Sequence, residues 1–378
     1  MTCRHRPRLA FTALTALIAL GACQSPPPPS TSRPAEPWTL EAARPDTTDG
    51  IRILVLHDME GLSGQSNPQT FFFGTAQYAL GQTLLAADIN AVIEGLYQGG
   101  ATEVHVVDGH GSGNPEPDVR RDLLDRRAVQ VIRDSTFDAY VDLVQPNAYD
   151  AVAVVGMHAK TGSGGFASHT YTLGIEFLIH GKTITETELV GLSWGRVGTP
   201  VIFGSGDDRL AKDLVTMPWL EFVTVKRAIA ADSAVPRPVE EARADLTASA
   251  RRAVEKLRAG KTQAMKVTTP VVTAIRTVPP ADLSLLEGVP GVDYKDGAVS
   301  FTADDLNASY RGLERLVGVA TRAYAGVLFE RLRGRPDWTR LESDYSQALE
   351  QRWFDVESGR WTRPRPAAPP ARKHHGFQ

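Results

Sequence analysis

The sequence predicts an α/β fold, in which a mostly parallel β-sheet is covered by helices on both faces and followed by a smaller α+β domain. Short apolar runs with the length of buried strands recur at 53–56, 104–107, 151–155 and 200–203. A segment with apolar residues at helical spacing, 76–98, separates the first two runs, and Gly99-Gly100 ends it. Apolar strands that alternate with helices indicate a parallel sheet with both faces covered, a Rossmann-like arrangement.

The character of the sequence changes beyond about residue 230. Helical sequence rich in Glu, Arg and Ala covers 239–259, a strand is predicted at 267–277, and a final helix near 306–332. We therefore expect a larger α/β domain at 51–230 and a smaller α+β domain at 231–335. The tail, 363–378, is rich in Pro, Arg and His, which predicts disorder.

The N-terminus has the pattern of a bacterial export signal, at 1–22. A basic start precedes the apolar run 9–20, which is too short to span a bilayer of roughly 30 Å. Leu20-Gly21-Ala22-Cys23 resembles a lipobox, so we expect Cys23 to be the lipidated N-terminus of the mature chain. The alternative is an ordinary signal peptide with an accidental cysteine.

The segment 23–48 contains four consecutive prolines and predicts an extended tether between the lipid and the folded body. These features together predict an exported protein, anchored by lipid in the cell envelope and facing the periplasm. Gln24, rather than Asp, follows the cysteine, and this favours the outer membrane.

Composition limits the partners and the chemistry. The formal net charge of -3 gives no sign of nucleic-acid binding or of binding to an anionic membrane surface, so membrane contact is expected through the lipid alone. The other cysteine, Cys3, lies within the signal, so the mature chain has none for a disulfide, a thiolate nucleophile or a zinc site.

Candidate metal ligands follow three of the predicted strands. Asp58 and Glu60 come after 53–56 and share a face, because residues i and i+2 of a strand point to the same side. His110 and His158 follow 104–107 and 151–155. Since open α/β sheets build their sites at the carboxyl ends of their strands, we expect these four side chains to lie close together.

Two other histidines in this part of the chain have simpler interpretations. His105 alternates with valines inside a strand, which indicates a packed or surface-facing residue. His180 precedes Gly181, which is typical of a hairpin turn.

Two further segments offer functional side chains. The glycine-rich stretch 162–170 presents His169, a suitable acid or base beside a cleft; the alternative is a flexible loop with an incidental histidine. A helix opens near Thr185, where Thr185 with Glu188, or Thr183 with Glu186, can form a capping box. The first pairing uses Glu188 in the cap and leaves Glu186 free, so Glu186 is the favoured ligand.

Asp58, Glu60, His110, His158 and Glu186 make up a set of carboxylates and imidazoles without a thiolate. Such a set suits Zn²⁺, and also Mn²⁺ or Co²⁺. A single catalytic zinc uses about three protein ligands, so this larger set indicates two ions about 3.5–4 Å apart that share a carboxylate. Two divalent ions leave a small positive charge on the cluster, which favours ionisation of a bridging water.

These motifs, in this order, resemble the zinc D-aminopeptidases first associated with bacterial dipeptide-transport operons. The resemblance covers about 52–325 and rests on an ordered set of motifs: Asp58-Met59-Glu60-Gly61 with Ser63-Gly64, Asp108-Gly109-His110-Gly111, Gly156-Met157-His158-Ala159, Ser168-His169-Thr170, the Glu186 helix and Gly206-Asp207-Asp208.

The resemblance implies that the five ligands hold two zinc ions per chain, with Asp58 bridging them. It also implies that His169 is the catalytic residue, which the family describes as a nucleophile. A hydroxide that bridges the metals is itself a sufficient nucleophile, so the alternatives for His169 are to move a proton or to stabilise the tetrahedral intermediate. It further implies a ring-shaped homo-oligomer whose inner channel admits short peptides with an N-terminal D-residue such as D-Ala.

The chain departs from the family pattern in three ways. The signal and lipobox would place it beside peptidoglycan, a source of D-Ala peptides. His57 stands before Asp58, as a group behind the ligands or a sixth ligand. The tether and the tail could alter or block ring assembly. The alternatives to a D-aminopeptidase are a related dinuclear metallohydrolase that acts on other amides or esters, and a non-catalytic lipoprotein that binds zinc or peptides.

Overall fold

The computed structural model describes residues 37–360, apart from 44–45, 47, 133–139, 141–142, 173–174, 278–282, 284–285 and 321–324. The predicted signal peptide, the lipidation residue Cys23, the first part of the tether and the predicted tail at 363–378 lie outside the described residues. Within the described part of the chain, no helix combines the length and the apolar character needed to cross a membrane.

A seven-stranded sheet forms the centre of the molecule, in the order β10-β9-β8-β5-β2-β3-β4. Its strands are β2 (Arg52–His57), β3 (Glu103–Asp108), β4 (Val129–Val131), β5 (Ala151–Val155), β8 (Val201–Asp207), β9 (Glu221–Ala230) and β10 (Ser233–Pro236). Neighbouring strands are parallel except for β10, which is antiparallel to β9. The predicted α/β fold with a mostly parallel sheet is therefore confirmed.

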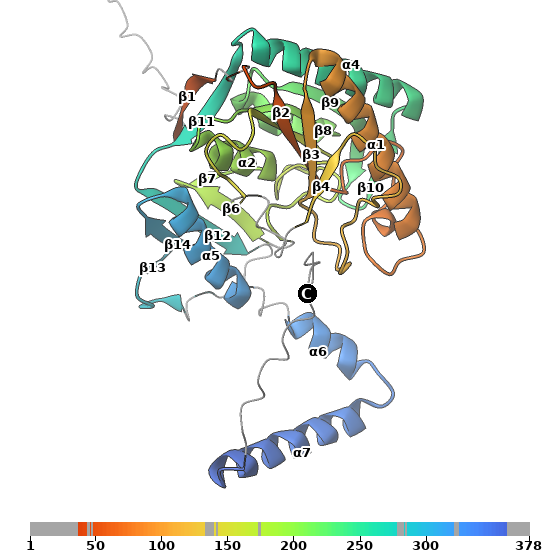
Figure 1. Cartoon of the computed structure of the whole chain (residues 1–378). Coiled ribbons are helices and arrows are strands. Elements are labelled where there is room, and N and C mark those ends of the chain that lie inside the picture. Colours follow the sequence, from red (N-terminus) through yellow and green to blue (C-terminus); the bar gives the residue numbers. More distant parts are fainter. Residues whose placement is uncertain are drawn as a thin grey trace, which may run out of the picture. The chain divides into compact units, whose positions relative to one another are not determined.

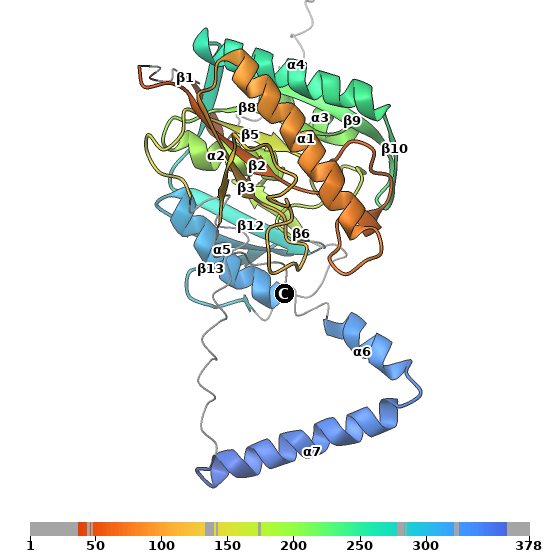
Figure 2. The same cartoon turned by 45° about the vertical axis from the view of Figure 1, so that its right-hand side comes forward.

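Each face of this sheet has its own apolar core, because side chains alternate along the strands. Ile53 and Val55 pack with helices α1 (Tyr78–Gly99) and α4 (Val239–Arg258), which lie side by side on one face (Figures 1 and 2). Leu54 and Leu56 belong to the core on the other face, which includes side chains of α2 (Glu186–Gly195). Helix α1 ends where the sequence predicts, with Gly100 in the left-handed conformation.

A second, antiparallel sheet has the order β13-β14-β12-β6-β7. Its strands are β6 (Ile175–Ile179), β7 (Lys182–Thr183), β12 (Val271–Thr277), β13 (Val292–Lys295) and β14 (Ala298–Ala303), and α5 (Leu306–Ala320) packs on β12 and β14. Strands from before and after residue 230 therefore pair in this sheet, and the predicted domain division at that point stays a prediction.

Several other elements are short or lie toward the C-terminus. They are η1 (Pro68–Thr70), α3 (Asp208–Asp213), η2 (Leu214–Thr216), α6 (Ala325–Arg333) and α7 (Trp338–Glu357).

The folded body begins before residue 51, because part of the predicted tether forms a strand. Strand β1 (Trp38–Ala43) pairs antiparallel with β11 (Thr262–Val267). Trp38 and Ala43, at the two ends of β1, are buried, and the ammonium group of Lys182 lies 4.4 Å from the centre of the Trp38 ring. Burial of these apolar side chains explains why the segment joins the body instead of staying extended in solvent.

The turn after β2 packs directly against the turn after β5. The amide of Gly61 donates a hydrogen bond to the carbonyl oxygen of Gly156 at 2.6 Å. A Cβ atom at position 61 would lie 2.0 Å from the carbonyl oxygen of Met157, so only glycine fits there. This contact brings the residues that follow the two strands, Asp58 and His158 among them, to the same place.

Lys226 on β9 is buried and contacts both the loop after β2 and the glycine-rich loop. Its ammonium group donates to the backbone oxygen of Glu60 at 2.6 Å and to the side-chain oxygen of Gln65. It also lies 4.5 Å from the centre of the Phe166 ring, in the glycine-rich loop. Burial, which penalises the charged form, lowers the pKa of Lys226 to about 7.

This buried lysine predicts a pH dependence of stability. Between pH 7 and 10.5 the unfolded chain binds a proton at Lys226 that the folded chain does not, so the free energy of unfolding rises with pH in this window. For the metal-free protein, the unfolding free energy of wild type should rise relative to that of Lys226→Met by up to roughly 5 kcal/mol. Denaturant unfolding at a series of pH values measures this difference.

Lys212→Met provides the control, because the Lys212 side chain is exposed and its ammonium group stays in water in both states. This variant should follow the wild-type curve. The prediction would be contradicted if the free energy of unfolding depended on pH in the same way for wild type and for Lys226→Met.

Candidate active site

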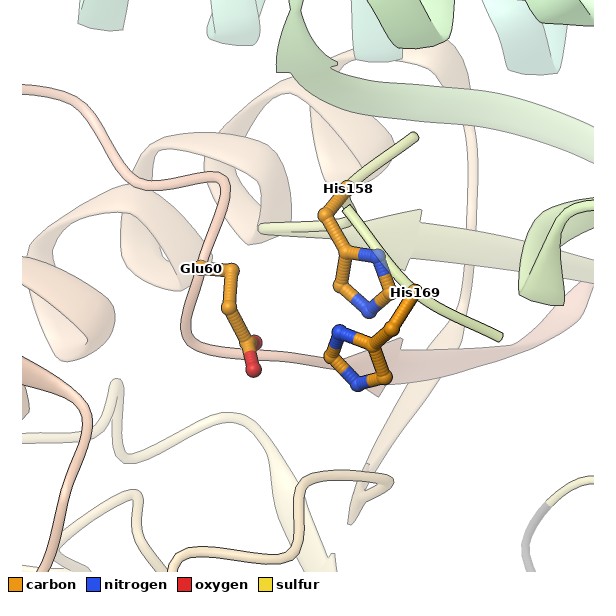
Figure 3. A group of neighbouring side chains, drawn as sticks. All are labelled: Glu60, His158 and His169. Carbon is orange, nitrogen blue, oxygen red and sulfur yellow. The ribbon is translucent and has the colours of Figure 1, made fainter. Parts of the chain in front are cut away.

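The structure brings together all six side chains that the sequence singles out for chemistry. Three groups of three residues have potential ligand atoms within 4.8 Å of one another: Asp58, Glu60 and His110; Asp58, His158 and Glu186; and Glu60, His158 and His169. The side chains of the third group point toward one another in Figure 3. The cluster lies where β2, β3 and β5 end, which is the edge of the sheet that the sequence predicts.

Asp58 lies between the other ligand candidates. Its Oδ2 is 3.2 Å from Nε2 of His158, and the same nitrogen is 3.6 Å from Oε2 of Glu186. On the other side, Nε2 of His110 is 3.3 Å from Oε1 of Glu60. Two groups of three ligands that share Asp58 have the number and type of donors to hold two divalent cations.

The electrostatics of the cluster favour cation binding. Burial, reinforced by the charge of Glu60, raises the pKa of Asp58 well above its usual range. Burial alone would lower the pKa of His110 and of His158, but the neighbouring carboxylates outweigh it and raise both values. Without a metal, these groups therefore retain protons to balance the buried carboxylates, and a divalent cation can replace those protons.

Glu186 is held in place by groups on both of its oxygens. Thr185 and Glu188 form the predicted capping box, so Glu188 is used by the cap and Glu186 is free to face the cluster. Oε2 of Glu186 accepts a hydrogen bond from the Tyr140 hydroxyl at 2.6 Å, and Oε1 accepts one from the Tyr171 amide at 2.7 Å. Neither tyrosine could be identified from the sequence, because neither belongs to a periodic pattern or a motif.

His110 is oriented by Asp118, another residue that no pattern in the sequence indicates. Nδ1 of His110 lies 2.8 Å from Oδ2 of Asp118, so Nδ1 carries the proton and Nε2 faces Glu60. Asp118 is fully buried and also accepts hydrogen bonds from Ser112, at 2.6 Å, and from Tyr78. Carboxylates that bind the far nitrogen of a metal-ligating histidine commonly fix its orientation and basicity.

Asp108, in the predicted motif, supports this loop and does not reach the ligand groups. Its carboxylate accepts hydrogen bonds from the backbone amides of His110, at 2.8 Å, and Asp118, at 2.6 Å. His57 is buried with Nδ1 3.8 Å from the Asp108 carboxylate, and it belongs to none of the three groups of potential ligands among the described residues.

The loop that carries His169 is held in an unusual backbone conformation. Ala167 and Tyr171 have φ angles of 52° and 74°, in the left-handed region that residues other than glycine rarely adopt. The carboxylate of Asp207, part of the Gly206-Asp207-Asp208 motif, accepts a hydrogen bond from the amide of Phe166 at 2.8 Å and also caps α3. These contacts fix the position of His169 beside the cluster.

The His169 ring stacks on His158, with the ring centres 3.9 Å apart. Its Nδ1 lies 2.7 Å from the carbonyl oxygen of Ala167 and therefore donates to it, which leaves Nε2 as an acceptor that faces the cluster, 3.8 Å from Glu186. Burial, with the charge of His158, lowers the pKa of His169. A neutral imidazole with a free acceptor nitrogen is suited to take up a proton.

The two other histidines have the environments that the sequence predicts. His105 hydrogen-bonds Glu103 at 2.6 Å and the Tyr149 hydroxyl at 2.9 Å, on the sheet and away from the cluster. His180 lies in the turn between β6 and β7, has a φ of 48°, and donates to the carbonyl oxygen of Thr268 at 2.9 Å.

A cavity of about 400 Å³ opens onto the cluster. Its lining includes Asp58, Glu60, His110, His169 and Glu186, together with Tyr140 and a group of apolar side chains. A second cavity, of about 490 Å³, lies at the opposite ends of the strands and is lined by residues such as Arg52, Glu103 and Asp150. None of the candidate ligands lines this second cavity, so the first is the candidate active site.

Comparisons with known proteins show the family to which the chain belongs. A D-aminopeptidase of Bacillus subtilis (strain 168) is 25% identical over 288 residues, which cover 72% of this chain and 98% of that protein. The solved structure of the zinc-dependent D-aminopeptidase DppA from Bacillus subtilis, described as a self-compartmentalizing protease, matches with a TM-score of 0.64 and 23% identity, and covers 72% of this chain and 98% of its own. The family model for D-aminopeptidases, Peptidase_M55, matches residues 51–315, and the chain therefore belongs to the D-aminopeptidase family.

Proposed function

We propose that this chain is a zinc-dependent aminopeptidase that removes an N-terminal D-residue, of the D-Ala type, from short peptides at a site for two zinc ions. The observation that carries the proposal is the pair of three-ligand groups that share Asp58, beside the acceptor nitrogen of His169. The zinc dependence of the structurally similar DppA supports the choice of metal, and Mn²⁺ or Co²⁺ would suit the same donors.

We assign the ligands to two positions. Glu60 and His110, together with Asp58, would hold one ion, and His158 and Glu186, again with Asp58, would hold the other. When bound, the two ions supply Lewis acidity to the scissile carbonyl and acidify a water molecule. His169 keeps its proton on Nδ1, bonded to Ala167, takes a proton from the attacking water on Nε2 and passes it to the leaving amine.

The proposal also includes the oligomeric state and the cellular location of the enzyme. The self-compartmentalizing character of DppA supports a homo-oligomeric ring for this chain as well. The signal and lipobox pattern ending at Cys23 supports export and a lipid anchor in the outer membrane, on its periplasmic face. Peptides derived from peptidoglycan would then be the substrates within reach.

The activity predicts a specific pattern of amino-acid release. The chain 24–378, loaded with Zn²⁺, should release D-Ala from D-Ala-D-Ala and nothing from L-Ala-L-Ala, and a chelator should abolish the release. His169→Ala should lower kcat by roughly 10²–10⁴-fold, because a general acid–base group is lost, without changing the zinc content. His180→Ala, in an exposed turn, is the matched control and should keep full activity.

The same experiment separates the alternatives. A sample that holds two zinc ions per chain but cleaves neither peptide would argue against the aminopeptidase. Activity on other amides or esters would then indicate a related metallohydrolase, and zinc or peptide binding without turnover would indicate a binding protein.

The contact between Asp118 and His110 predicts an effect on metal affinity. The Asp118 carboxylate orients His110 and increases the basicity of its ring. Asp118→Asn keeps the size of the side chain but removes this negative charge. The affinity for zinc should fall by roughly 10–100-fold, as measured by competition with a chromophoric chelator. Asp122→Asn, an exposed residue of the same loop that pairs with Arg120, should bind zinc like wild type. Equal affinities for the two variants would show that Asp118 does not act through His110.

A further inference from the structure

The candidate active site has an apolar wall that the proposed chemistry does not use. Pro68, Phe71 and Phe72, in and just after η1, line the cavity on this side, and Ala167 and Ala231 extend the wall. The cavity volume of about 400 Å³ falls within the range of roughly 300–1,000 Å³ that is typical of ligand pockets. The site therefore has room for more than the two methyl groups of a dialanine peptide.

The two phenylalanines of the wall differ in their environments. Phe71 is buried and packs edge-on against Phe166, with ring centres 6.0 Å apart, and against His110, at 6.3 Å. The centre of the Phe72 ring lies 4.7 Å from the centre of the Phe71 ring. Phe72 also lines the cavity, and 43% of its surface is exposed. An apolar group that bound against Phe72 would remove this surface from water and gain hydrophobic free energy.

The wall is held in place before any ligand binds. Asn67 caps η1 by accepting from the amide of Gln69 at 3.0 Å, and Pro68 occupies its first turn. The side-chain amide of Gln65 donates to the Thr70 hydroxyl at 2.8 Å, and Gln65 is itself bonded by Lys226. The segment that presents Phe72 is thus joined to the turn that presents Glu60, so little conformational entropy is lost when a ligand binds.

The polar and apolar parts of the cavity suit different residues of a peptide substrate. In the proposed function, the ligand cluster and His169 surround the scissile carbonyl and the N-terminal residue, whose side chain is a methyl group. In a bound peptide, the following residue would extend from the cluster toward the part of the cavity that Phe71 and Phe72 line.

We propose that Phe72, backed by Phe71, is a specificity-determining residue that binds a large apolar side chain on the residue after the scissile bond. This inference rests on the proposed function and narrows its substrate class to D-Ala peptides whose second residue is bulky and apolar. Such peptides are cleaved in preference to D-Ala-D-Ala.

The test compares four peptides in the zinc-loaded chain 24–378: D-Ala-D-Ala, D-Ala-D-Leu, D-Ala-D-Phe and D-Phe-D-Ala. Wild type should cleave D-Ala-D-Phe and D-Ala-D-Leu with a kcat/KM roughly tenfold or more above that for D-Ala-D-Ala, the contrast that an apolar pocket can provide. Phe72→Ala should lose this preference, so that its kcat/KM values for D-Ala-D-Phe and D-Ala-D-Leu fall to within about twofold of its own value for D-Ala-D-Ala. Val215→Ala, an exposed apolar residue that does not line the cavity, should retain the preference.

Zinc content and thermal unfolding, measured for each variant, show whether a change in preference reflects the subsite or a damaged fold. Equal rates on the three D-Ala peptides in wild type, or a preference that survives in Phe72→Ala, would overturn the subsite while leaving the proposed function intact. A Phe72-dependent preference for D-Phe-D-Ala alone would overturn the assignment to the second residue. No cleavage of any of the four peptides would overturn the proposed function, and the subsite with it.

Discussion

The structure depends on one electrostatic constraint, the burial of two carboxylates close to a third, that of Asp58. Asp58, Glu60 and Glu186 are all buried, and Asp58 belongs to two of the groups of potential ligands. Like charges in such a place raise each other's free energy unless cations or protons compensate them. The imidazoles of His110 and His158 compensate them in part, and the proposed zinc ions would do so fully.

The surrounding residues keep these charges close together despite their repulsion. Gly61 allows two turns to approach at a distance that no side chain would permit, and Lys226 joins the Glu60 turn to the loop of His169. Tyr140 and the amide of Tyr171 hold the two oxygens of Glu186. Most of these contacts involve the backbone or groups on distant segments, so the site is assembled by the fold as a whole rather than by one motif.

Because the site combines local motifs with contacts between distant segments, only part of it could be predicted from the sequence. The parallel sheet and the location of the ligands followed from local patterns, because apolar runs mark buried strands and the ends of parallel strands meet at one edge. The choice between Glu186 and Glu188 was also local, since a capping box needs only four consecutive residues. Asp118, Tyr140 and Lys226 could not be found in this way, because each acts on a residue distant in the chain or in an irregular loop, where no periodicity reports the contact. The order of the second sheet was likewise beyond local patterns, since β6 pairs with a strand almost a hundred residues away.

Strand β1 has a consequence for shortened forms of the protein. The family match begins at residue 51, but β1 is the strand that pairs with β11, and the sheet they form has two strands. A chain that starts at residue 51 would leave the hydrogen-bonding edge of β11 without its partner and expose the surface that Trp38 covers. Unprotected strand edges pair readily with other chains. Such a fragment would therefore tend to aggregate through β11 even if its catalytic residues were correctly folded.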